Sequence, residues 1–163
     1  MRRYVYVGPA DVRALVASSP RGHAIHVAAD LARLVDGEPM TFIVDVRGIL
    51  HVAPRRSEHV ACAGGDDVLS AGELIATCDR DRVRVTDISN QSTGYGPEPE
   101  SWPAVAKALD DAGIAHDGSF TYEATFRRCP SCKQRNLVKE DWFECAMCGN
   151  ALPRTWNFDV PDA

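Results

Sequence analysis

The sequence predicts an α+β fold, with a mixed or antiparallel sheet, about three helices and a small C-terminal unit built on cysteines. Three observations predict it: β-branched runs in the middle of the chain, apolar residues at helical spacing on either side, and paired cysteines near the end. Of the 163 residues, 45% are hydrophobic and 25% are charged, as in ordinary globular proteins. We expect an α+β domain over residues 1–124, and the cysteine unit with its tail over residues 125–163.

The N-terminal part of the chain predicts one strand and two helices. Residues 3–7 are rich in Val and Tyr, which favours a strand. Pro9 is pre-set for the first turn of a helix that follows directly. After a break at residues 18–22, apolar side chains at helical spacing predict a second helix over residues 23–35, closed by Gly37.

The middle of the chain predicts a sheet. Residues 41–46 and 49–53 are two β-branched runs separated by Arg47-Gly48, a turn signal, so they read as a hairpin. Residues 73–76 and 82–88 read as further strands.

A long loop and a third helix follow the predicted sheet. Residues 89–100 are polar and punctuated by Gly and Pro, as in a loop. Ser101 is a suitable N-cap for a helix that runs to Ala112, and Gly113 ends it. Residues 120–122 predict a short strand before the cysteine unit.

Four cysteines near the C-terminus predict a metal site. They follow the pattern Cys-x2-Cys-x12-Cys-x2-Cys, at Cys129, Cys132, Cys145 and Cys148. Each pair brings two thiolates to one side of a turn, and strands at residues 126–128 and 142–144 would bring the pairs together. Because four protein ligands leave no open position on Zn²⁺, we expect a structural zinc ion and not a catalytic one.

This segment resembles the zinc-ribbon class over residues 126–150. The resemblance implies the fold of the segment but no particular task, since zinc ribbons occur in nucleic-acid-binding proteins, in enzymes and in docking modules. Gly149 follows the last cysteine, where a tight turn requires positive φ. The tail at residues 156–158 is too aromatic for a loose end, so we expect it to pack on the ribbon or on the main domain.

The charge pattern bears on the kind of partner. The formal net charge is −5 at pH 7, whereas nucleic-acid-binding proteins usually present a basic face. A local cluster of cations surrounds the first cysteine pair: Arg127, Arg128, Lys133, Arg135 and Lys139. These cations can equally offset the negative charge of a zinc–thiolate centre. Nucleic acid therefore stays open as a partner, but the charge does not favour it.

No stretch of the chain approaches the roughly 20 apolar residues that cross a bilayer. The N-terminus also lacks the apolar core of a signal peptide. We expect a soluble, cytoplasmic protein without a membrane partner. In that reducing compartment the cysteine pairs would serve as metal ligands and not as disulfides.

Residues 54–73 and 89–97 carry a second resemblance. His59, Gly64-Gly65, Ala71-Gly72-Glu73, Ser92, Tyr95 and Pro97 occupy places comparable to a pattern of the plant IQ-motif calmodulin-binding proteins and some bacterial relatives. The resemblance spans residues 41–112 and implies a shared α+β domain. Gly94 and Gly96 stand where that family's loop has His and Arg, and the chain has no IQ motif. The resemblance therefore implies no reaction.

The loops at residues 54–67 and 89–100 hold the side chains that could act on a ligand. Arg55 and Arg56 could bind a small anionic ligand. The catalytic residues are left open, with three candidates for proton transfer: His59, Glu73 and Tyr95.

Tyr95 is also a candidate ligand contact. Gly94 and Gly96 beside it allow either a ligand to approach the backbone or a tight turn with the ring as an anchor. Cys62 and Cys78 read as core thiols.

Three functions fit these observations. The first is a binding or scaffold module, whose partner, a protein or a small anionic ligand, meets the surface formed by loops 54–67 and 89–100. The second is a small enzyme with its cleft between the same loops, which convergence of His59, Glu73 and Tyr95 on one cavity would favour. The third is nucleic-acid binding through the ribbon. Whether the protein is an enzyme is left open.

Overall fold

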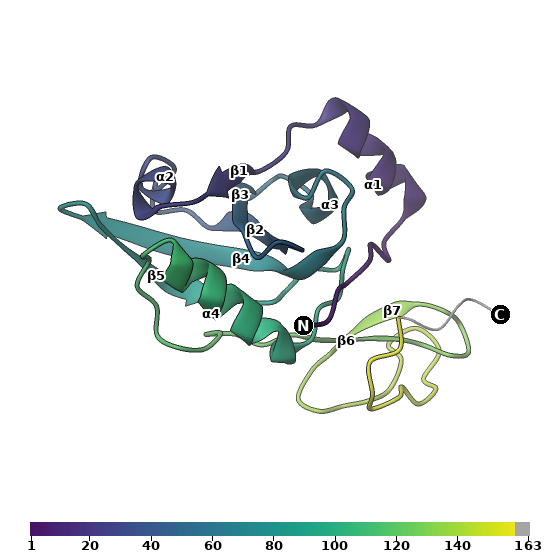
Figure 1. The fold of residues 1–163 in the computed structure, drawn as a ribbon. Coiled ribbons are helices and arrows are strands. Elements are labelled where there is room, and N and C mark those ends of the chain that lie inside the picture. Colours follow the sequence, from purple (N-terminus) through teal and green to yellow (C-terminus); the bar gives the residue numbers. More distant parts are fainter. Residues whose placement is uncertain (159–163) are drawn as a thin grey trace.

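Two antiparallel sheets organise the chain in a computed structural model that describes residues 1–158 (Figure 1). The larger sheet has five strands in the order β1-β3-β2-β4-β5, and the smaller one pairs β6 with β7. The strands are β1 His23–Ile25, β2 Met40–Asp45, β3 Leu50–Pro54, β4 Val68–Asp79, β5 Arg82–Ile88, β6 Thr125–Arg128 and β7 Arg135–Val138. The helices are α1 Ala10–Ala14, α2 Ala28–Ala32, α3 His59–Cys62 and α4 Trp102–Asp111. The predicted α+β fold is confirmed.

Helices cover both faces of the large sheet, which splits its core into two layers. Along β2, Phe42 and Val44 pack with α2 and α4 on one face, while Ile43 packs with α3 and the N-terminal segment on the other. This alternation follows from the period of two in a strand. Figure 1 shows α4 and α3 on opposite sides of the strands.

The hairpin at residues 41–53, the strand over residues 82–88 and the helix before Gly113 form where the sequence predicts them. The strand predicted at residues 73–76 is longer and becomes β4, which pairs with both β2 and β5. Its Gly72 is required because the backbone of Ser89 crosses directly over it and leaves no room for a Cβ. That crossing directs the 89–100 loop along the sheet.

The helix predicted over residues 23–35 is wrong in its first half. His23–Ile25 forms the edge strand β1 and pairs with β3, so tertiary pairing overrides the helical spacing. The Asp30 carboxylate accepts hydrogen bonds from the backbone N–H groups of His26 and Val27, and this fixes the start of α2 at Ala28. The strand predicted at residues 3–7 reduces to a single bridge between Tyr4 and Val68.

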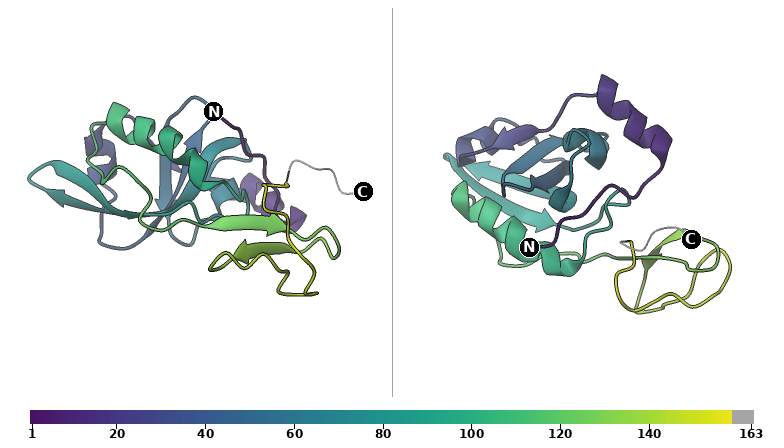
Figure 2. Two further views of the ribbon diagram at one scale, coloured as in Figure 1. Left: turned by 90° about the horizontal axis from the view of Figure 1, so that it is seen from below. Right: turned by 45° about the vertical axis from the view of Figure 1, so that its right-hand side comes forward.

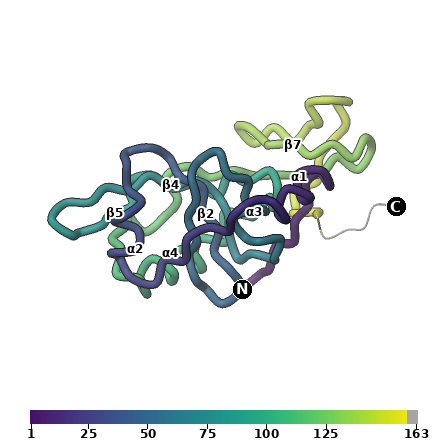
Figure 3. Tube along the Cα trace, turned by 90° about the horizontal axis from the view of Figure 1, so that it is seen from above, coloured from purple at the N-terminus to yellow at the C-terminus, as the bar shows by residue number. Residues whose placement is uncertain are grey.

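The ribbon forms a lobe beside the large sheet (Figures 2 and 3). Its two strands, β6 and β7, flank the first cysteine pair. The strand predicted at residues 142–144 reduces to a single bridge between Glu144 and Ala151, and Glu140 and Asp141 adopt positive φ and turn the chain before Trp142. The aromatic tail packs back as expected, with Phe158 against Ala124 and Phe126.

Candidate functional site

The four cysteines of the ribbon converge on one point. The Sγ atoms of Cys129, Cys132, Cys145 and Cys148 all lie within 4.8 Å of one another. Two cross-pairs, Cys129–Cys148 and Cys132–Cys145, are each 3.5 Å apart. A tetrahedral ion with metal–sulfur bonds of about 2.3 Å would separate the sulfurs by about 3.8 Å, so the cluster has the size of a metal site.

The two cysteine turns have the same backbone geometry. In each turn the first cysteine N–H donates to the carbonyl five residues later, at 2.8 Å: Cys129 to Gln134 and Cys145 to Asn150. The residue after the second cysteine has positive φ in both turns, 64° at Lys133 and 76° at Gly149. The predicted positive φ at Gly149 is confirmed.

Hydrogen bonds in these turns favour thiolate. Although burial opposes ionisation of Cys145, the N–H groups of Cys148 and Met147 and the side chain of Asn136 lower its pKa to about 6. The pKa of Cys132 moves the other way. A hydrogen bond from Gln134 lowers it, but burial and the three neighbouring sulfurs outweigh that bond and raise it to about 12. Four thiols this close cannot all ionise without a cation, because the thiolates repel one another. A bound cation would offset this repulsion. The residues therefore fit a metal ion, for which they would supply four sulfur ligands.

The ribbon is fastened to the 89–100 loop by a buried ion pair. Arg127 of β6 is only 4% exposed, and its Nη1 lies 2.7 Å from Oε1 of Glu98. The same guanidinium donates to the carbonyl oxygens of Pro153 and Arg154 in the tail. One side chain thus joins the ribbon, the loop and the tail.

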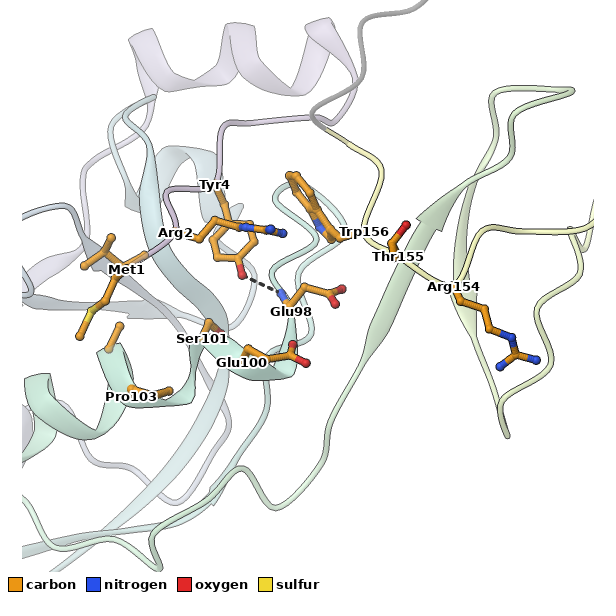
Figure 4. A pocket seen from close by; sticks show the side chains of 12 residues that line it. Met1, Arg2, Tyr4, Glu98, Glu100, Ser101, Pro103, Arg154, Thr155 and Trp156 are labelled. Carbon is orange, nitrogen blue, oxygen red and sulfur yellow. Dashed lines mark hydrogen bonds between the residues drawn. The ribbon is translucent and has the colours of Figure 1, made fainter.

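A cavity of about 580 Å³ lies along this seam (Figure 4). On its wall the Tyr4 hydroxyl accepts a hydrogen bond from the Glu98 N–H at 3.2 Å, and Arg2 lies over the Trp156 ring. Trp156 also donates to the carbonyl of Gly96 at 2.8 Å. Several of its lining groups therefore hold the tail against the domain.

The predicted loops 54–67 and 89–100 meet at a different, smaller cavity of about 210 Å³. Its lining includes Arg55, Arg56, His59 and Glu73, together with Gln91 and Thr93. Nε2 of His59 donates to the carbonyl of Gly72 at 2.8 Å, and burial lowers the pKa of His59, so the ring is neutral near pH 7. One ring nitrogen of His59 is therefore already committed to the fold.

Tyr95 does not line this cavity. It is fully buried in the core on the α3 face, and its hydroxyl donates to the carbonyl of Asp66 at 2.7 Å. Burial raises the pKa of the phenol. The structure therefore brings His59 and Glu73 together and places Tyr95 apart from them. Cys62 is buried, whereas Cys78 is exposed and is not part of the core.

The cations around the first cysteine pair do not form one face. Arg127 is buried against Glu98, Arg128 lies over the Phe158 ring, and Arg135 donates to the carbonyl of Thr93. Lys133 and Lys139 are exposed on the ribbon.

Asp45 and His51 form a hydrogen-bonded pair of ionisable side chains that was not among the predicted site residues. Both sit on the predicted hairpin, on the α3 face of the sheet, and their side chains are joined at 2.7 Å. The signal available in the sequence is two ionisable residues among the apolar arms of a buried hairpin.

Comparison with protein-family models, with curated proteins and with solved structures finds no match for the chain. The resemblance of residues 41–112 to the plant IQ-motif proteins thus gains no support from relatives. Within residues 1–158, none of the helices has the length and apolar character needed to cross a membrane.

Proposed function

We propose that the protein is a cytoplasmic binding module whose ribbon is held by one structural Zn²⁺. The convergence of four sulfur atoms within 4.8 Å supports the metal site in this proposal. Thiolate sets select Zn²⁺ among the common divalent cations, and a reducing compartment keeps the thiols available. With four protein ligands the ion supplies folding energy and not a reaction centre.

Metal analysis tests the zinc assignment. The purified chain should contain one zinc per molecule, and Cys145→Ser should lose most of it together with stability. Cys78→Ser is the matched control, because Cys78 is an exposed thiol outside the cluster. A Cys145→Ser variant with full zinc content and an unchanged melting temperature would refute the assignment.

The binding surface of this module is the junction of loops 54–67 and 89–100. The cavity there, at about 210 Å³, is smaller than the roughly 300–1,000 Å³ of sites that enclose a small molecule. A protein partner that inserts a side chain fits this size better than a metabolite does. Arg56 is exposed beside it, whereas Arg55 lies 3.9 Å from Glu73, so Arg56 offers a cation to an acidic residue of the partner.

Site-specific cross-linking tests the surface. A photo-reactive residue at Ser57 should give a discrete cross-linked partner in the producing cell, and the double variant Arg55→Glu/Arg56→Glu should abolish it. The same probe at Asp79, an exposed position in the last part of β4, should not give that product. Equal yields of the cross-linked product from both positions would refute the proposed binding surface.

A small enzyme is the second candidate, because His59, Glu73 and both arginines line one cavity. An activity that disappears in His59→Asn, with stability and zinc content kept, would favour the enzyme over the binding module.

A further inference from the structure

A second cavity, of about 590 Å³, opens on the α3 face of the large sheet beside the β2–β3 turn. Its lining includes Asp45, His51, Cys62 and the three arginines Arg3, Arg21 and Arg47. Its volume lies within the range of small-molecule sites. It shares no lining residue with the cavity between the two predicted loops.

The Asp45 carboxylate is held as an anion in this cavity wall. Oδ1 accepts hydrogen bonds from the N–H groups of Arg47 at 2.9 Å and Ile49 at 3.0 Å. Oδ2 accepts from the Arg47 guanidinium at 3.1 Å and from His51 at 2.7 Å. Burial acts to raise the pKa of Asp45, but the hydrogen bonds from His51, Ile49 and Arg47 outweigh it and lower the pKa.

An ionised carboxylate only accepts hydrogen bonds, so Nε2 of His51 must carry the proton that it shares with Asp45. In the neutral ring Nδ1 is then an acceptor. No protein atom among residues 1–158 hydrogen-bonds to Nδ1, although His51 is only 9% exposed. Among residues 1–158 the one buried side-chain nitrogen or oxygen without a partner is Oγ of Ser92, so Nδ1 of His51 is reached from the cavity. His51 thus offers an oriented and unpartnered nitrogen in the wall of a cavity.

A β-bulge displaces Asp45 from the regular pairing of β2 with β4. The register between β2 and β4 shifts between Val44 and Asp45, which marks a bulge at the end of β2. Bulges redirect a side chain and are common beside binding and active sites. The shift places Asp45 opposite Val68, whose backbone also pairs in both directions with Tyr4 and so anchors Arg3 at the cavity.

Three arginines, Arg3, Arg21 and Arg47, and three aspartates, Asp45, Asp66 and Asp67, line the cavity, so anion binding there depends on guanidinium groups that the aspartates do not already pair. Arg21 is paired with Asp66 at 2.8 Å, and Arg47 with Asp45 at 3.1 Å. Arg3 has no ion pair within residues 1–158. Cys62 is less suited to chemistry here, because burial raises the pKa of its thiol to about 12 and its Sγ points to the His51 carbonyl at 3.7 Å.

We propose that this cavity binds a small organic anion, with a carboxylate or phosphate group on Arg3 and Arg47 and a hydrogen-bond donor of the ligand on Nδ1 of His51. Asp45 is a positioning residue, since it fixes the tautomer and orientation of the ring. The ligand class follows from guanidinium groups, which match carboxylate and phosphate oxygens, together with one oriented acceptor.

Nuclear magnetic resonance on the zinc-loaded full chain tests the site, with inorganic phosphate and glycolate, a carboxylate that carries a hydroxyl donor, as separate probes. At constant ionic strength either probe should give saturable shifts of the His51 ring nitrogens and of the amides around the cavity. Arg3→Gln should weaken binding about tenfold, as expected for one charge-assisted hydrogen bond. Arg82→Gln, an exposed arginine at the start of β5 that lines neither cavity, should leave it unchanged.

Saturation by phosphate alone identifies a phosphate ligand, and saturation by glycolate alone identifies a carboxylate. The proposal is overturned if neither probe saturates, if chloride produces the same shifts, or if Arg82→Gln weakens binding as much as Arg3→Gln. His51→Asn should remove the ring signal but keep the zinc content. The protein should still bind the anion after it has lost its zinc, because the cavity lies on the large sheet.

Discussion

At the scale of single residues, buried charges in this protein are held by several partners at once. Arg127 is bound by the Glu98 carboxylate and by two carbonyl groups of the tail, and Asp45 accepts four hydrogen bonds. An unpaired buried charge costs several kcal/mol, whereas exposed pairs contribute little. The effect of a substitution therefore depends on which partner is left alone.

Arg127→Ala should lower the free energy of unfolding by about 3 kcal/mol, because it leaves Glu98, whose side chain is only 15% exposed, without its cation. Urea denaturation of the zinc-loaded protein measures this. Lys107→Ala removes an exposed pair with Asp111 and should cost only about 0.3–0.5 kcal/mol. Equal losses from the two variants would show that the Arg127 contact is not buried in solution.

Asp45→Asn should lower stability by about 2 kcal/mol at pH 7, since it replaces a carboxylate that accepts charge-assisted hydrogen bonds. The pKa of Asp45 is lower in the folded state than in the unfolded chain. Its contribution is therefore complete above about pH 4 and is lost as the pH falls through the folded value. Urea denaturation at pH 7, 5 and 3 should show the gap between wild type and Asp45→Asn closing at pH 3. Asp79→Asn is the exposed control, and a gap independent of pH would contradict the linkage.

At the scale of elements, the local sequence pattern correctly predicted those segments whose tertiary contacts favour the same secondary structure. The hairpin at residues 41–53 and helix α4 carry their own turn and cap signals and were predicted. Strand β1 was not, because its pairing with β3 is invisible in a helical pattern. The cysteine site was readable from spacing alone. The Asp45–His51 pair depends on a bulge between β2 and β4, which no local signal reports.

The two cysteine turns have the same backbone conformation but carry different residues, Lys133 and Gly149, at the position of positive φ. Substitutions at these two positions should therefore have opposite effects. Gly149→Ala should destabilise the zinc-loaded protein by about 1–2 kcal/mol, since a Cβ is strained there. Lys133→Gly should be neutral or stabilise by up to about 1 kcal/mol, because it relieves the same strain. Thermal unfolding at high ionic strength, which screens the lost charge of Lys133, compares them. Destabilisation of equal size in both variants would contradict the equivalence of the turns.

At the scale of the whole molecule, the N-terminal segment and the tail before residue 159 meet at the 89–100 loop. Tyr4 near the N-terminus and Trp156 in the tail pack edge to face, with ring centroids 5.5 Å apart, and both hydrogen-bond to that loop. Arg127 adds the ribbon to the same junction. The division into residues 1–124 and 125–163 therefore predicts how the parts unfold. We expect the ribbon to need a bound metal in order to fold, and the 89–100 loop to need the folded ribbon in order to stay ordered.

Chelation of the metal tests this dependence. Because metal binding in such a site is also folding energy, removal should unfold the ribbon and release Trp156 from Gly96, while β2 and β4 stay packed between the helices. Hydrogen exchange should show amides of residues 89–100 losing protection and those of β2 keeping it. Tryptophan emission should shift to the red, and Trp156→Phe should remove most of the shift, since Trp142 is already exposed and Trp102 packs against Phe120. Simultaneous loss of protection in β2 would mean that the ribbon and the large sheet fold as a single unit. Unchanged protection of residues 89–100 would mean that the loop is ordered without the ribbon.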